Sequence, residues 1–215
     1  MCLTALFYCV VVAWYMERCA IHMIKNIYKK DYSIHQKIGQ KGRLVDEISY
    51  IGDYYILPFS QKEKSKTNLV NLAITLVIIA MLLLAGFANQ DSSRTFWIVF
   101  PYLIIYIPTG YMLLGAFTYI HAPIRMQNVQ FETGIERMRR SGIGVLIFTT
   151  LSIILDIVYM ILHRNNLNWS RELIYFFCQF FILVVIFLFR KYYARIYAGI
   201  TKECSEIKQS EIQET

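Results

Sequence analysis

Five polar residues whose side chains could handle protons or ions recur at steps of three and four along one apolar stretch. They are Thr149, Ser152, Asp156, Tyr159 and His163. Residues at this spacing share one face of an α-helix. In a membrane such a face indicates either a path for protons or ions or side chains that hydrogen-bond neighbouring helices. We favour the second reading for Thr149 and Ser152, and for Asp156 both readings stay open.

Asp156 needs polar neighbours, because a buried carboxylate without donors is unfavourable. Residues 163–172 form a turn, and Asp156 and Gln179 are equally far from its centre. In an antiparallel hairpin both would lie roughly 10 Å below the interface at 1.5 Å per residue, and similar counting brings Tyr102 and Tyr106 to that level. We predict that Asp156 points into the bundle and either bonds to one of these three residues or holds a proton. The candidate intramembrane polar site comprises Asp156, Gln179, Tyr102, Tyr106, Thr149, Ser152 and Tyr159.

Motifs that would define an enzyme are missing from the sequence. It contains no HExxH, no GxSxG and no glycine-rich loop followed by lysine, which zinc proteases, serine hydrolases and nucleotide-binding proteins require. Of the four histidines, His121 and His163 are expected at opposite membrane faces and cannot share a metal. The five cysteines include no CxxC pair, which favours reduced thiols. We therefore predict no catalytic residues, no metal site and no cofactor.

The elements that would position the polar site are transmembrane helices. Hydrophobic residues make up 56% of the 215 residues, and the mean hydropathy is +0.41. Four apolar stretches, 69–88, 95–120, 142–162 and 173–189, are long enough to cross roughly 30 Å of hydrocarbon. Residues 1–16 are a slightly short fifth candidate, and they lack the basic start and the cleavage site of a signal peptide. The expected fold class is all-α: a polytopic transmembrane helical bundle with four spans plus an N-terminal fifth.

The positive charges predict the orientation of this bundle. Nineteen of the 22 lysines and arginines fall in residues 17–67, 121–141 and 190–215. Excess positive charge stays in the cytoplasm, so these segments should face inward and the N-terminus outward, in the plasma membrane. The expected organisation is an N-terminal helix (1–16), a basic cytoplasmic segment with an interfacial amphipathic helix (17–67), a four-helix bundle (68–189) and a cytoplasmic tail (190–215).

The inner ends of the spans are expected to contact anionic lipid headgroups. Aromatic residues between 54 and 59 are interpreted as an anchor at headgroup level, in preference to a site for a partner protein. The basic residues are expected to orient the chain without forming a specific lipid site. They are Lys62, Lys64, Lys66, Arg137, Arg139, Arg140, Arg190 and Lys191.

Three classes of function are compatible with this sequence. The main hypothesis is a structural or regulatory membrane subunit, because few polar residues lie in the spans. A small oligomeric transporter or channel is the alternative, supported by Asp156 and by Pro101 and Pro108, which tend to kink a helix. A membrane-embedded enzyme has the least support. The expected partners are the lipid bilayer and either another membrane protein or a second copy of the chain. Nucleic acid is not expected, because the net charge of +7 is spread around apolar spans and not over one basic face.

Overall fold

The computed structural model describes residues 31–38, 44–165 and 167–204. Four long helices dominate it: α2 (Gln61–Phe87), α3 (Phe96–His121), α5 (Arg137–Leu162) and α6 (Trp169–Ile196). All four are long and apolar enough to cross a membrane, which confirms the four long apolar helices expected there. The expected fifth span at 1–16 and the amphipathic helix expected near its end lie outside the described residues.

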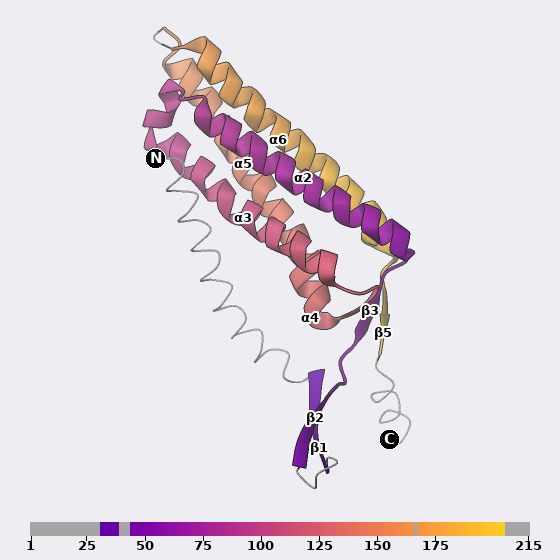
Figure 1. The fold of residues 1–215 in the computed structure, drawn as a ribbon. Coiled ribbons are helices and arrows are strands. Elements are labelled where there is room, and N and C mark those ends of the chain that lie inside the picture. Colours follow the sequence, from indigo (N-terminus) through magenta and orange to yellow (C-terminus); the bar gives the residue numbers. More distant parts are fainter. Residues whose placement is uncertain (1–30, 39–43, 166, 205–215) are drawn as a thin grey trace.

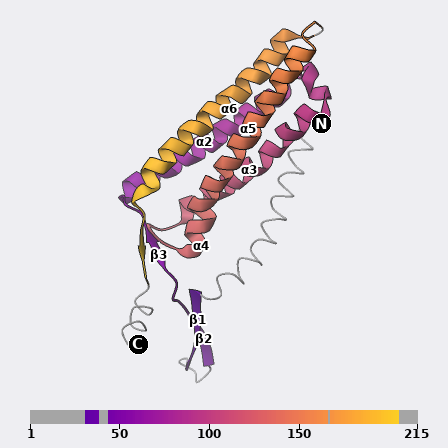
Figure 2. The same cartoon turned by 180° about the vertical axis from the view of Figure 1, so that it is seen from behind.

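The four helices form a closed bundle in which each contacts two others, in the order α2, α3, α5, α6 (Figures 1 and 2). Its interior is lined by aliphatic and aromatic residues such as Ile78, Ile105, Met112 and Ile182, all completely buried. Large apolar residues such as Leu84, Ile154 and Phe177 are exposed on the outside. Because the outside is apolar along the helices, the surface is suited to hydrocarbon and not to water.

Small residues bring α3 and α5 close together. A Cβ atom added at Gly144 would lie 3.0 Å from Cβ of Pro108, and one added at Gly115 would lie 2.8 Å from Cγ of Met138. Such close approach is typical of helix pairs in membranes, where packing replaces the hydrophobic effect as the driving force. Pro108 lies inside α3, and the helix continues past it to His121. The proline therefore serves the contact with α5.

Five short strands gather at one end of the bundle, and the all-α expectation missed them. Strands β1 (Tyr32–Ile38) and β2 (Leu44–Tyr50) form an antiparallel hairpin. Strands β3 (Tyr54–Ile56), β4 (Arg125–Gln127) and β5 (Thr201–Glu203) form a sheet in the order β4–β3–β5. The sheet joins the segment before α2, the α3–α5 connection and the segment after α6 (Figure 1).

The aromatic segment before α2 belongs to this sheet, which corrects its interpretation as a headgroup anchor. Tyr55 stacks on Phe131 at 4.1 Å between ring centroids, Arg125 lies 4.3 Å above the ring of Tyr54, and Leu57 is buried. Strand β3 pairs with β4 on one side and with β5 on the other, so its side chains pack on the protein. Ser60 caps the start of helix α2, and its hydroxyl and backbone form a reciprocal capping box with Glu63.

Polar contacts fasten the strands to the bundle. The Tyr50 hydroxyl donates to the carbonyl of Asp53 at 2.8 Å and accepts from the backbone N–H of Asn128 at 3.0 Å. Burial raises the pKa of this phenol, which keeps it protonated and able to donate. Lys202 on β5 forms an ion pair with Asp53 at 2.8 Å, and this hydrogen bond raises the pKa of the lysine. The C-terminal strand is thus fixed by both backbone pairing and charge.

Candidate functional site

The polar face of α5 is buried in the middle of the helix and becomes exposed at its last turns. Thr149, Ser152 and Asp156 are completely buried in the bundle. Tyr159 is half-buried and stacks on the exposed ring of His163 at 4.3 Å between centroids. Only the first three residues therefore belong to a buried site, and the side chains that end α5, such as Ile161 and Leu162, are exposed.

Asp156 does not form the hydrogen bond that we predicted from Gln179, Tyr102 or Tyr106. Neither of its carboxylate oxygens has a hydrogen-bond partner among the described residues, and the same is true of both polar atoms of Gln179. The Tyr102 hydroxyl instead donates to the carbonyl of Leu82 at 2.6 Å and lies 2.8 Å from the Tyr106 hydroxyl. Asp156 interacts with Glu172 and with Ser92, and both of these residues are fully buried.

The position of the turn explains the wrong partner. Helix α5 ends at Leu162 and α6 begins at Trp169, so the centre of the connection lies nearer to Asp156 than we assumed. With these ends, the residue at equal depth on α6 is Tyr175, one helical turn before Gln179. Tyr175 is buried and its hydroxyl lies 2.9 Å from that of Ser152. The ring centroids of Tyr175 and Tyr102 lie 5.9 Å apart.

Glu172 is the site residue that the sequence reasoning missed. It lies in the first turn of α6 and is completely buried. Its carboxylate accepts from the backbone N–H of Ser92 at 2.9 Å and from the Ser92 hydroxyl at 2.8 Å. Ser92 lies in the short helix η2 (Asp91–Arg94) between α2 and α3. A signal was available, because Glu172, Tyr175 and Gln179 follow one another at steps of three and four, as the α5 residues do.

We call this group the buried acidic cluster. It places two carboxylates in the interior of the bundle, and it has no lysine, arginine or histidine among its members. Within the part of the chain that the structure describes, no three histidine, cysteine, aspartate or glutamate side chains are grouped to bind a metal. The negative charge of the cluster can therefore be neutralised by a proton, or by a small cation bound by carboxylate, hydroxyl and amide oxygens together. Its members are Ser92, Ser152, Asp156, Glu172, Tyr175 and Gln179.

At the opposite end of the bundle, Lys64 is not positioned to contact lipid, which corrects its place among the headgroup residues. It is 3% exposed, its Nζ donates to the carbonyl of Ala122, and it lies 5.8 Å from the ring centroid of Tyr119. The cause is helical position, since Lys64 shares the inner face of α2 with the buried Thr67 and Asn71. The other basic residues named for this role are exposed, apart from the half-buried Arg137.

No protein-family model, no curated protein and no solved structure matches this chain.

Proposed function

We propose that this chain is a multi-pass membrane protein that binds and releases a proton at Asp156, as a small proton-conducting or proton-coupled transporter. The observation that carries the proposal is a completely buried carboxyl group that has no hydrogen-bond donor on either oxygen among the residues the structure describes, near a second buried carboxylate. An ionised carboxylate in such a place is unfavourable, and protonation removes the charge. Ionisable groups inside membrane bundles are usual sites of proton relay.

The two carboxyl groups are expected to take different roles. Glu172 accepts two hydrogen bonds from Ser92 and lies in the first turn of α6, where the helix dipole favours negative charge. These two donors hold the Glu172 carboxylate in a fixed position. Among the described residues, neither oxygen of Asp156 has a partner at hydrogen-bond geometry, and Glu172 and Ser92 are its polar neighbours. Asp156 is therefore the group that holds the exchangeable proton.

The membrane orientation belongs to the same proposal. The segments with the excess of positive charge include those that form the sheet end of the bundle, which supports a cytoplasmic sheet and a cytoplasmic C-terminus. The buried acidic cluster then lies near the outer face of the plasma membrane. Four helices enclose little space, so we expect the transporting form to be an oligomer or to include the N-terminal residues.

Proton flux into vesicles tests the proposal. Purified protein is reconstituted with a pH-sensitive dye inside, and a potassium diffusion potential drives protons inward. We expect flux from the wild-type protein and at least a tenfold loss in Asp156→Asn with unchanged thermal unfolding. Asp91→Asn is the matched control. Asp91 is an acidic residue of η2, directly before Ser92, and it is not fully buried. Flux that is equal in wild type and Asp156→Asn would overturn the proposal.

A structural or regulatory subunit is the second candidate. The β1–β2 hairpin favours this candidate. It extends beyond the sheet end of the bundle and away from the helices (Figure 1), so it offers a surface to which another protein could bind. This candidate predicts no proton flux from the wild-type protein. It also predicts that Asp156→Asn leaves the function of the partner complex unchanged.

A further inference from the structure

The sheet end of the bundle carries a second feature that the proton site does not involve. A cleft of about 360 Å³ lies between the start of α5 and the last turns of α6. Two guanidinium groups and two tyrosines line it: Arg139, Arg190, Tyr193 and Tyr197. We propose that this cleft is a specific binding site for the phosphate headgroup of an anionic phospholipid. This differs from the general contact with headgroups that the basic residues alone predict.

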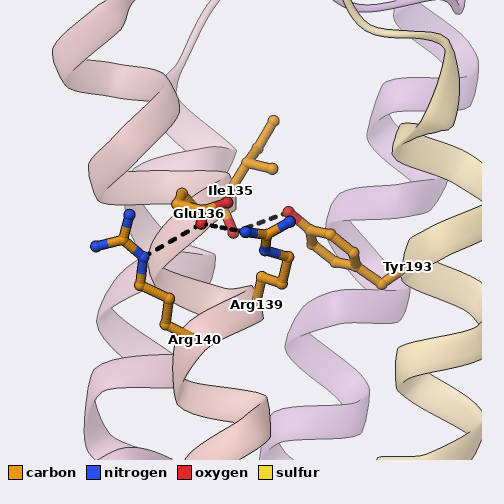
Figure 3. A network of polar contacts seen from close by, with 5 residues as sticks. All are labelled: Ile135, Glu136, Arg139, Arg140 and Tyr193. Carbon is orange, nitrogen blue, oxygen red and sulfur yellow. Dashed lines mark hydrogen bonds and ion pairs between the residues drawn. The ribbon is translucent and has the colours of Figure 1, made fainter.

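The charges at the cleft are held in place and are not fully neutralised. The Glu136 carboxylate accepts from Nη2 of Arg139 at 2.6 Å and from Nε of Arg140 at 3.2 Å, and its side chain is only 14% exposed (Figure 3). One carboxylate thus orients two guanidiniums, of which that of Arg139 lines the cleft, and Arg190 adds a second positive charge there. A guanidinium bound along one edge keeps N–H donors on the other, which suits the geometry of phosphate.

The walls of the cleft are rigid. The Tyr193 hydroxyl donates to the backbone carbonyl of Ile135 at 3.1 Å (Figure 3). Ile135 lies in η3 (Glu132–Glu136), a π-helical turn that leads into α5, and turns of this kind recur at functional sites. Tyr193 and Tyr197 are both 8% exposed, with ring centroids 4.5 Å apart. A preformed wall lowers the entropic cost of binding.

Small residues at the end of α6 and in the short 3-10 helix that follows it, η4 (Tyr197–Gly199), leave the space that a headgroup would fill. Ala194 in α6 and Ala198 in η4 both line the cleft and are exposed. Larger side chains there would project into the cleft. The site is thus a shallow recess beside the helix, open at the surface.

A lipid suits the cleft because the positive charge of Arg139 and Arg190 borders an apolar surface. Phe187 and Leu188 directly precede this end of α6 and are 50% and 58% exposed. A phospholipid headgroup at Arg139 and Arg190 could extend its acyl chains along this surface. A soluble phosphate compound would leave it uncovered, and a neutral lipid would leave the arginines without an anion.

Lipid binding to the full-length protein tests the site. The protein is purified in a neutral detergent, titrated with dioleoyl phosphatidylglycerol or dioleoyl phosphatidylcholine, and analysed by native mass spectrometry for the first bound lipid. We expect wild type to prefer phosphatidylglycerol by at least about tenfold, and Arg139→Gln/Arg190→Gln to lose that preference, since each basic group contributes about a fivefold change. Arg164→Gln/Arg195→Gln is the control with the same change in charge, at residues that do not line the cleft.

A second variant guards against misfolding of the arginine pair. Ala194→Phe fills the cleft without changing charge, and it should also remove the preference. The proposal is overturned by equal binding of the two lipids to wild type, or by an equal loss in the control pair. It is also overturned if Ala194→Phe retains the preference, or if glycerol phosphate without acyl chains displaces the lipid at equal concentration, which would assign the cleft to a soluble phosphate.

Discussion

The contact between Ser92 and Glu172 should be the main polar link between the η2 turn and α6. The Ser92 hydroxyl and backbone N–H donate to separate oxygens of the Glu172 carboxylate at 2.8 and 2.9 Å, and both residues are completely buried. Ser92→Ala removes only the hydroxyl donor. Glu172→Ala leaves two buried donors without an acceptor, which should cost about 2–6 kcal/mol at roughly 1–3 kcal/mol for each unsatisfied group.

A double-mutant cycle isolates the hydroxyl bond in this pair. Ser92→Ala, Glu172→Ala and the double variant are unfolded in mixed detergent micelles, and the free energies of unfolding are compared. Hydrogen bonds between membrane helices contribute about 0.6 kcal/mol on average and about 1.7 kcal/mol at most. A charged acceptor strengthens the bond, so we expect a coupling near the upper limit, about 1.5 kcal/mol. A coupling below about 0.3 kcal/mol would show that the carboxylate is not held by Ser92 and would refute this contact as the link between η2 and α6.

Three further predictions test other parts of the structure. Gly144→Leu should separate α3 from α5 and lower the free energy of unfolding by about 1–3 kcal/mol, measured in the same micelles, whereas an unchanged value would deny their close contact. The pKa of Lys202 is raised above the ordinary lysine value of 10.5 by Asp53. The ion pair between Lys202 and Asp53 therefore stabilises β5 fully below that value, and this stabilisation is lost as the pH rises through the raised pKa. Limited proteolysis should cleave after β5 faster at strongly alkaline pH, and Asp53→Asn should remove this pH dependence. In a cysteine-free variant, single cysteines within 165–168 should react with an impermeant reagent from outside and those within 205–213 should not; the reverse pattern would invert the orientation.

The long helices could be predicted from the sequence because their signal is local. Each apolar run falls in the range of lengths that can span a bilayer, and this signal does not depend on the neighbours of the helix. The helix ends were less accurate. Helix α2 begins at Gln61 and includes three lysines, and α6 continues to Ile196, because polar residues extend a helix after its apolar part has ended.

The small sheet could not be predicted by the same reasoning. Strands β3, β4 and β5 have three residues each, and their pairing joins Tyr54 to Gln127 and to Glu203. No local alternation can reveal partners so far apart in the chain. The aromatic residues near β3 were therefore assigned to the membrane interface, although they pack on the protein.

The candidate site shows the same division between local and long-range information. Helical spacing identified the face that carries Thr149, Ser152 and Asp156, because periodicity is a property of one helix. The neighbours of that face depend on the position of a turn and on η2, a short helix that lies between α2 and α3. An error of a few residues in the turn replaced Tyr175 by Gln179, and Glu172 was assigned to the turn itself.

A measurement of the protonation state of Asp156 tests the proposed proton site. Infrared difference spectra of the reconstituted protein, wild type minus Asp156→Asn, isolate the carbonyl band of this one carboxyl group among the 15 aspartates and glutamates. We predict a protonated carboxyl band at neutral pH that is present in the wild-type protein, absent in Asp156→Asn and retained in Asp91→Asn. A wild-type spectrum without that band, in protein shown to be folded, would mean that Asp156 is ionised and would contradict the proposed proton site.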